Sequence, residues 1–192
     1  MDPPIFYSPE QIRIVARSFK SNTAIGCDLW ALKEIALMPD AALYSLGNIL
    51  SQMQHSAIPP AQVLTNIMAT LPKKDGGTRT VAVTATLYRL LMQLDNDQME
   101  VFEAREAFEN DSAKAGASAV DAAENRALEA EIAQAEGKFT MVLLWDIKKF
   151  FDSIDIPILF QKAGELGFPL KQLVMSMIVH QAPRRLKLGK AI

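Results

Sequence analysis

The sequence predicts an α+β protein in which helices outnumber strands. Three features carry this prediction. Apolar residues recur at helical spacing over much of the chain, which indicates amphipathic helices. A turn sequence, Asp75-Gly76-Gly77, separates two short segments of strand character, which indicates a hairpin. An apolar run from Phe139 to Trp145 ends abruptly in Asp146, which indicates a buried strand.

Composition limits what kind of protein this is. The chain has 192 residues, of which 49% are hydrophobic, enough for one good core or two small ones. A formal net charge of −2 argues against nucleic-acid binding through general basicity, so any such binding needs a local basic patch. The single cysteine, Cys27, excludes an internal disulfide and a cysteine-rich zinc site. With no signal-like N-terminus and no run of membrane-spanning length, we expect a soluble intracellular protein without a membrane partner.

The N-terminal third of the chain predicts helices. Ser8 is a suitable N-cap for a helix that reaches about Phe19. A second helix is expected to open at residues 26–30, with Asp28 as its N-cap, and to end at the next proline. A third is expected over residues 40–54, where leucines, an isoleucine and a methionine recur at helical spacing before a proline pair.

The hairpin prediction centres on residues 63–84. Residues 63–71 could finish a helix or form a strand, and the turn sequence follows directly. Residues 78–84 alternate and are β-branched, as expected of the second strand. Three cations flank the turn: Lys73, Lys74 and Arg79. The simplest interpretation treats them as edge-strand charges that discourage aggregation.

Beyond the hairpin the apolar spacing is again helical, from residue 86 to about residue 102. Residues 95–111 are mostly acidic, which indicates a solvated helix face. A polar stretch over residues 109–117 predicts a loop. Ser118 then opens an alanine-rich helix, which Gly137 is expected to end.

The apolar run that ends in Asp146 predicts a way to present a carboxylate. A buried strand holds the acid rigidly, while the strand end leaves it open to solvent, a cation and a substrate. The simpler alternative is that Asp146 caps a following helix. After Asp155 two further helices are expected, and residues 183–192 look like the beginning of another strand.

The basic hairpin and the strand-end aspartate together suggest a reaction. Lysine and arginine on a hairpin can neutralise a triphosphate, and an aspartate at a strand end can hold the magnesium ions that bridge its phosphates. Each feature alone is common in proteins. The pair favours nucleotidyl transfer.

The residues of these two features resemble a known family. LPKKDGGTRTVAVTATLYRLL, Leu71 to Leu91, resembles the fingers motif of reverse transcriptases, and LLWDIKKFFDSID resembles their first palm motif. The order and separation of the motifs also match. The GCDLW and APRRLKLGKAI segments and the alanine-rich helix resemble non-LTR retroelement and group II intron enzymes more than retroviral ones. The similarity covers roughly Ala24 to Ile192.

The resemblance implies an α+β fold made of fingers and a partial palm. It divides the chain into a helical N-terminal region (1–62), a fingers subdomain with the hairpin (63–138) and the first half of a palm whose sheet is incomplete (139–192).

The resemblance also implies roles for individual residues in the palm. Asp146 matches the first catalytic, metal-binding aspartate, which with the backbone carbonyl of Ile147 would hold Mg²⁺ for an in-line displacement. Phe151 matches the aromatic steric gate, whose ring leaves no room for a 2′-hydroxyl and so favours deoxynucleotides.

In the fingers, Lys73 and Arg79 match the cations that bind the dNTP triphosphate, and Lys74 is a weaker candidate. We assign the remaining polar and aromatic residues of the palm motif mainly to structure, with Asp155 as the N-cap of the next helix.

The sequence departs from the family in its carboxylates. Family members carry two more aspartates in a Tyr-x-Asp-Asp hairpin, whereas residues 156–192 contain no aspartate and only Glu165 as a glutamate. One aspartate cannot offset the charges of a two-metal site. We therefore expect an N-terminal fragment of an RNA-directed DNA polymerase, inactive alone through truncation or an incomplete gene model, whose intact form uses an RNA template, a primer strand and dNTPs.

Two alternatives stay open. The chain could be a non-catalytic RNA-binding or interaction domain derived from a decayed retroelement. It could also come from a polymerase that copies RNA into RNA, against which Phe151 argues.

Overall fold

The computed structural model describes residues 5–74, 76–107, 116–143, 145 and 150–187, without the side chains of Phe151, Asp152 and Lys187. The chain forms two compact units, Met1–Met99 with Gly167–Ile192 and Glu100–Leu166. Helices and a small three-stranded sheet agree with the predicted α+β class. The three predicted subdomains stay a prediction. None of the described helices has the length and apolarity needed to cross a membrane.

The first unit contains helices that pack against one another. They are α1 (Pro9–Ser18), α2 (Leu32–Ile35), α3 (Asp40–Ser56), α4 (Thr86–Leu94) and α9 (Leu170–Gln181). Helix α5 (Asn96–Glu106) continues the chain from this unit into the other. The predicted cap of α1 is confirmed: the Ser8 hydroxyl accepts the Gln11 backbone N–H, and the Gln11 side chain accepts the Ser8 N–H.

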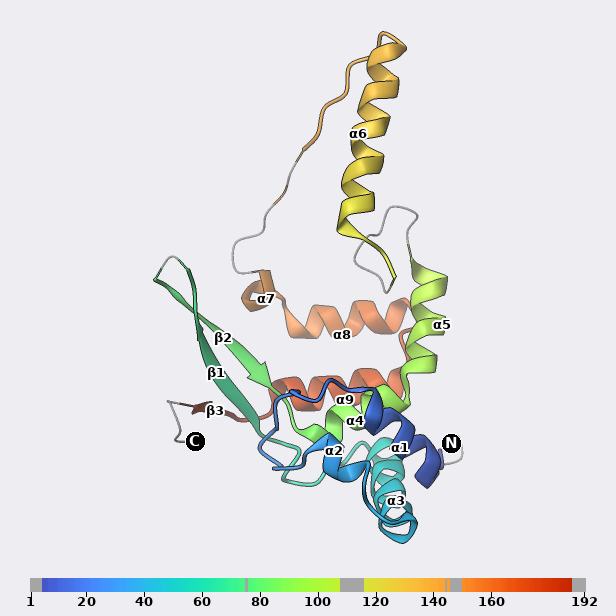
Figure 1. The fold of residues 1–192 in the computed structure, drawn as a ribbon, viewed down its shortest axis with the longest axis vertical. Coiled ribbons are helices and arrows are strands. Elements are labelled where there is room, and N and C mark those ends of the chain that lie inside the picture. Colours follow the sequence, from blue (N-terminus) through green and yellow to red (C-terminus); the bar gives the residue numbers. More distant parts are fainter. Residues whose placement is uncertain (1–4, 75, 108–115, 144, 146–149, 188–192) are drawn as a thin grey trace. The chain divides into compact units, whose positions relative to one another are not determined.

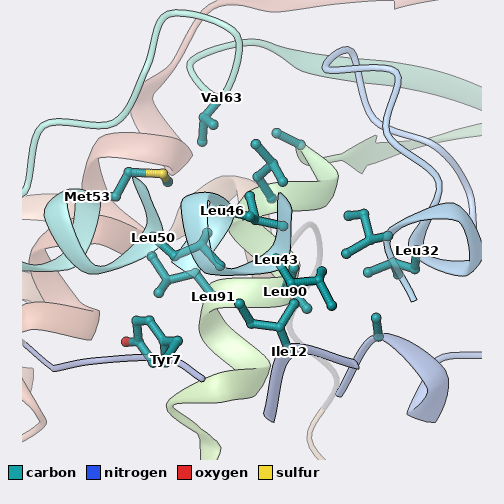
Figure 2. Close-up of a cluster of buried hydrophobic side chains, with 14 of the residues drawn as sticks. Tyr7, Ile12, Leu32, Leu43, Leu46, Leu50, Met53, Val63, Leu90 and Leu91 are labelled. Atoms are coloured by element: carbon teal, nitrogen blue, oxygen red, sulfur yellow. The ribbon is translucent and has the colours of Figure 1, made fainter. Parts of the chain in front are cut away.

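The core of the first unit lies where α1, α3 and α4 meet (Figure 2). Apolar residues three and four apart place one face of α3 inward, as predicted, although Ile49 remains 44% exposed. Helix α1 adds Ile12, and α4 adds Leu90 and Leu91, all of them fully buried. The side chains of the labelled cluster are Tyr7, Ile12, Leu32, Leu43, Leu46, Leu50, Met53, Val63, Leu90 and Leu91.

The predicted cap of the second helix is wrong. Helix α2 spans a single turn, and its N-cap is Ala31 rather than Asp28. Leu29 has a left-handed backbone, with a φ of 59°, which interrupts any helical path through this segment. The Asp28 carboxylate instead accepts the backbone N–H of Leu87 at 2.9 Å, in the first turn of α4. It therefore satisfies a free donor of a helix that lies far away in sequence.

The acidic segment after α4 was predicted to be a solvated helix face, but its first residue is buried. Asp95 is only 3% exposed, and its two carboxylate oxygens accept hydrogen bonds from the Tyr7 hydroxyl and the Gln54 amide, each at 2.6 Å. Burial raises the pKa of Asp95, although hydrogen bonds from Tyr7, Gln54 and Gln172 oppose the shift. This carboxylate joins the N-terminal segment, α3 and α9 inside the core.

The sheet has the strand order β2-β1-β3. Strands β1 (Asn66–Pro72) and β2 (Thr78–Val83) pair antiparallel, which confirms the predicted hairpin and shows that residues 66–72 form a strand. Strand β3 (Arg184–Lys187) pairs parallel to the first part of β1, as expected of a strand beginning near residue 183. Figure 1 shows the hairpin leading away from α4, with β3 beside its base.

The second unit contains α6 (Ala119–Ala135), α7 (Phe150–Ser153) and α8 (Ile156–Glu165). Two predicted caps are confirmed here. The Ser118 hydroxyl accepts two backbone N–H groups at the start of α6, and the Asp155 carboxylate accepts the Ile158 N–H at 3.0 Å. None of the described residues from 100 to 166 is buried.

The predicted buried strand ahead of Asp146 is wrong for the part that the structure describes. Residues 139–143 and Trp145 lie outside any strand, and they are exposed, Trp145 by 83%. An apolar run becomes a strand only when neighbouring strands satisfy its backbone groups. Among the described residues, strands pair only in the sheet β2-β1-β3, to which this run does not contribute.

Candidate functional site

A glycine-rich turn brings the two strands of the hairpin together. The Lys73 backbone N–H donates to the Gly77 carbonyl at 2.7 Å, and the Gly76 N–H donates back to the Lys73 carbonyl at 3.2 Å. Gly76 has a φ of 82°, a conformation that favours glycine. The turn therefore fixes the backbone of Lys73.

The predicted triphosphate ligands lie on this hairpin and are exposed. Arg79 pairs with Leu71 across the strands, whereas Lys73 follows the last residue of β1 in the turn. Within the described part of the chain, neither these two cations nor Lys74 forms an ion pair. The hairpin thus carries positive charge that no described carboxylate neutralises.

The base of the hairpin is anchored while its far half is not. Asn66 is buried: its backbone N–H donates to the Pro183 carbonyl at 2.9 Å, and its side-chain amide donates to the Val179 carbonyl at 2.7 Å. Burial along β1 decreases steadily from Asn66 to the exposed Pro72. The hairpin is therefore an arm that is held at one end.

The predicted palm ligands are not brought into a described site. Asp146 and Ile147, predicted to hold Mg²⁺, lie outside the described residues, so their roles stay a prediction. Phe151, the predicted steric gate, belongs to α7, whose backbone alone is described at this position. Among the described residues, no group of three histidine, cysteine, aspartate or glutamate side chains could hold a metal ion.

A second basic segment lies on the same sheet as the hairpin. Arg184 and Arg185 are exposed residues of β3, in register with Asn66 and Ile67 at the base of β1. The Arg184 guanidinium also donates to the His180 carbonyl at 3.5 Å, a long contact. The sheet therefore carries cations at the base of the hairpin as well as near its turn.

The pocket found in the first unit does not coincide with these cations. It has a volume of about 420 Å³, and α1, α2 and the segment between them provide most of its lining. No described residue of the hairpin lines it. Its lining includes the cations Arg17, Lys20 and Lys33, but nothing in the sequence or geometry assigns it a ligand.

Sequence reasoning missed one group of residues at the hairpin. The segment Gly26–Asp28 contacts the chain at both ends of the hairpin, through Thr65 before β1 and Thr84 after β2. The available signal was the glycine itself, because a glycine outside a turn often marks close approach of two backbones. The partners that it approaches could not be read from the sequence, since they lie far along the chain.

A comparison with models of protein families matches residues 71–190 to the family described as reverse transcriptase (RNA-dependent DNA polymerase). A comparison with curated proteins returned no match. The matched region begins in β1, contains the whole turn with Lys73 and Arg79, and continues through β3. It covers more than half of the chain, and it includes both segments whose residues predicted nucleotidyl transfer. The chain belongs to the reverse transcriptase family.

Proposed function

We propose that this chain provides the nucleotide-binding fingers and part of the palm of an RNA-directed DNA polymerase. The observation that carries the proposal is the exposed hairpin inside the family match. It holds Lys73 and Arg79 beside a fixed turn, without a carboxylate partner among the described residues. Such cations are suited to the triphosphate of an incoming dNTP.

The two cations have different parts in this proposal. Arginine offers a planar fork that can donate two parallel hydrogen bonds to one phosphate, whereas lysine is a compact point charge. Arg79 is on a paired strand position, so its Cα is fixed by the ladder opposite Leu71. Lys73 is fixed by the turn hydrogen bonds. Both side chains can therefore reach for phosphate from a defined backbone.

The remaining steps of the reaction rest on the palm motif. Asp146 and the Ile147 carbonyl would hold Mg²⁺, which supplies charge neutralisation and Lewis acidity when bound. Phe151 would lie under the incoming sugar and exclude a 2′-hydroxyl. These roles follow from the family motif. The expected template is RNA, and the expected primer is a strand annealed to it.

The 192-residue chain by itself is expected not to extend a primer. It contains no Tyr-x-Asp-Asp sequence, and the family places two of its metal-binding aspartates there. The same observation favours a second candidate function, a non-catalytic domain that retains RNA binding. The two candidates differ in whether the chain's nucleotide contacts are used for chemistry.

Primer extension and RNA filter binding on the 192-residue chain test its expected inactivity, and primer extension by a longer protein that contains this sequence separates the two candidates. We expect the chain to retain an RNA–primer duplex on the filter and to add no nucleotide. In a longer protein that contains this sequence together with a Tyr-x-Asp-Asp motif, Asp146→Asn should abolish extension without unfolding. Phe151→Ala in that protein should raise ribonucleotide incorporation. Extension by the 192-residue chain would contradict the proposed inactivity, and an active Asp146→Asn variant would contradict the metal role.

A further inference from the structure

The orientation of the hairpin is decided at its base. Strand β3 pairs with β1 only from Asn66 to Ala69, so beyond that point the described arm is a two-stranded ribbon. A strand advances about 3.3 Å per residue, which puts the far end of β1 about 20 Å from Asn66. A tilt of about 5° at the base would then move the far end by about 2 Å. Small changes at the base therefore displace Lys73 and Arg79.

One short segment contacts the chain on both sides of this base. The Cys27 thiol lies within hydrogen-bonding distance of two carbonyls, that of Thr65, the residue before β1, at 2.8 Å and that of Gln62 at 3.2 Å. Gly26 packs against the chain just after β2. A Cβ added to Gly26 would lie 2.6 Å from the Thr84 carbonyl oxygen and 2.7 Å from the Ala85 Cα, distances that real side chains do not adopt.

The segment is also fixed to the helix that follows the hairpin. The Asp28 carboxylate accepts the Leu87 N–H at 2.9 Å, in the first turn of α4. From the same helix, the Arg89 guanidinium donates to the Ala24 carbonyl at 2.6 Å. Residues 24–28 and the first turns of α4 are thus joined by hydrogen bonds, and the residues that follow β2 pack against the same segment.

We infer that Gly26, Cys27 and Asp28 are positioning residues, here called the hairpin brace, which hold both ends of the hairpin and so set where Lys73 and Arg79 meet a triphosphate. The inference rests on the proposed function, in which those two cations bind the dNTP. None of the three brace residues needs to touch the nucleotide.

The residue types of the brace suit this role. Only glycine allows the backbone contact at position 26, because any Cβ would meet main-chain atoms that cannot move separately from the hairpin. Burial raises the pKa of the Cys27 thiol and the neighbouring Asp28 carboxylate adds to the effect, so the thiol keeps the proton that it donates. Cys27→Val removes that donor at similar volume, whereas Cys27→Ser keeps a donor.

The test uses nuclear magnetic resonance on the 192-residue chain, with two measurements. The first is hydrogen exchange of the β1 and β2 amides, and the second is titration with dGTP and Mg²⁺. Gly26→Ala should speed exchange at the hairpin base about tenfold, because its Cβ clashes with main-chain atoms. Cys27→Val should do the same, because it removes the thiol donor. Both should weaken dGTP binding about three- to tenfold, as expected when phosphate ligands are displaced.

Matched variants separate positioning from general damage. Gly164→Ala adds a Cβ in α8 that meets no described atom within 4 Å outside the helix's own nearby backbone, so it should change neither measurement. Cys27→Ser should restore exchange and affinity toward wild-type values, whereas Cys27→Val should not. If Gly26→Ala fails to fold, this pair at position 27 decides. Equal behaviour of the serine and valine variants would overturn the role of the thiol.

The double variant Lys73→Ala/Arg79→Ala distinguishes failure of the brace from failure of the proposed function. If it binds dGTP as well as wild type does, the triphosphate role is wrong, and with it the positioning role. If it weakens binding while Gly26→Ala and Cys27→Val leave affinity unchanged, the proposed function stands and the brace is refuted. Weakened binding by all three, with faster exchange only in the brace variants, is the result that the inference requires.

Discussion

Removing the Tyr7 hydroxyl tests the buried network around Asp95. In Tyr7→Phe the ring keeps its place in the core, and only the 2.6 Å hydrogen bond to the Asp95 carboxylate is lost. A hydrogen bond to a charged group contributes about 1.5–3 kcal/mol. Because Gln54 still donates to the other oxygen, we expect a loss of about 2 kcal/mol in the free energy of unfolding. For a chain of this size, that corresponds to a Tm lower by about 4–8 °C.

Urea unfolding measures this loss, and Tyr44→Phe provides the matched control. Tyr44 is 51% exposed and its ring packs at a tilt against Phe6, so removal of its hydroxyl should change the free energy of unfolding by less than about 0.5 kcal/mol. Equal stability of Tyr7→Phe and wild type would refute the idea that the hydroxyl stabilises a buried carboxylate.

The pH dependence gives the same network a second test. Burial raises the pKa of Asp95, so the folded state binds its proton more tightly than the unfolded state does. The stability contribution of Asp95 is therefore fully present below its ordinary pKa near 4, and it is lost as the pH rises through the raised folded pKa. Asp95→Asn should flatten this part of the profile of unfolding free energy against pH. An unchanged slope in that variant would contradict the assignment.

Two further substitutions test local packing and capping. Gly47→Ala should destabilise by about 1–3 kcal/mol in urea unfolding, because its Cβ would lie 2.4 Å from the Tyr7 carbonyl oxygen, whereas Gly164→Ala should be neutral or stabilising. A neutral Gly47→Ala would mean that the backbone can retreat there. Ser8→Ala should cost about 1 kcal/mol by removing the N-cap of α1, whereas Ser45→Ala, inside α3, should not. Equal effects of the two serine variants on Tm would contradict the capping argument.

Local chemistry allowed much of the fold to be predicted. Ser8, Ser118 and Asp155 were identified as caps because the donors that they satisfy lie two or three residues away. The hairpin was found because its turn demands glycine, which the sequence places at position 76. These elements depend on neighbours in the sequence.

The misassigned residues have partners that lie far along the chain. Asp28 caps α4 from 59 positions away, and Asp95 is buried by Tyr7, which is 88 positions away. Contacts between residues so far apart in sequence cannot be predicted from the spacing of neighbouring residues. The prediction of a strand before Asp146 was wrong for the same reason, because a strand needs partner strands and hydrophobicity alone does not supply them.

Some residues of the candidate site could be predicted from the sequence and others could not. Charge and turn chemistry drew attention to Lys73, Lys74 and Arg79, and the family resemblance singled out Lys73 and Arg79 as triphosphate ligands. The structure presents both on the exposed hairpin, and their ligand role stays a prediction. The brace was missed because a glycine and a cysteine carry no charge signal, and their partners become visible only in the fold. Asp146 and Phe151 stay predictions of the family motif.

The most direct test of the central claim compares the affinities of the hairpin for two nucleotides that differ in their number of phosphates. Wild-type chain is titrated with dGTP and with dGMP while the amide resonances of β1, β2 and their turn are followed. We predict that dGTP shifts these resonances at lower concentration than dGMP does, and that Lys73→Ala/Arg79→Ala removes the difference, whereas a control pair of exposed cations, Arg17→Ala/Lys20→Ala, preserves it. Equal affinity for the two nucleotides, or a preference that survives in Lys73→Ala/Arg79→Ala, would contradict the claim that this hairpin binds the incoming triphosphate.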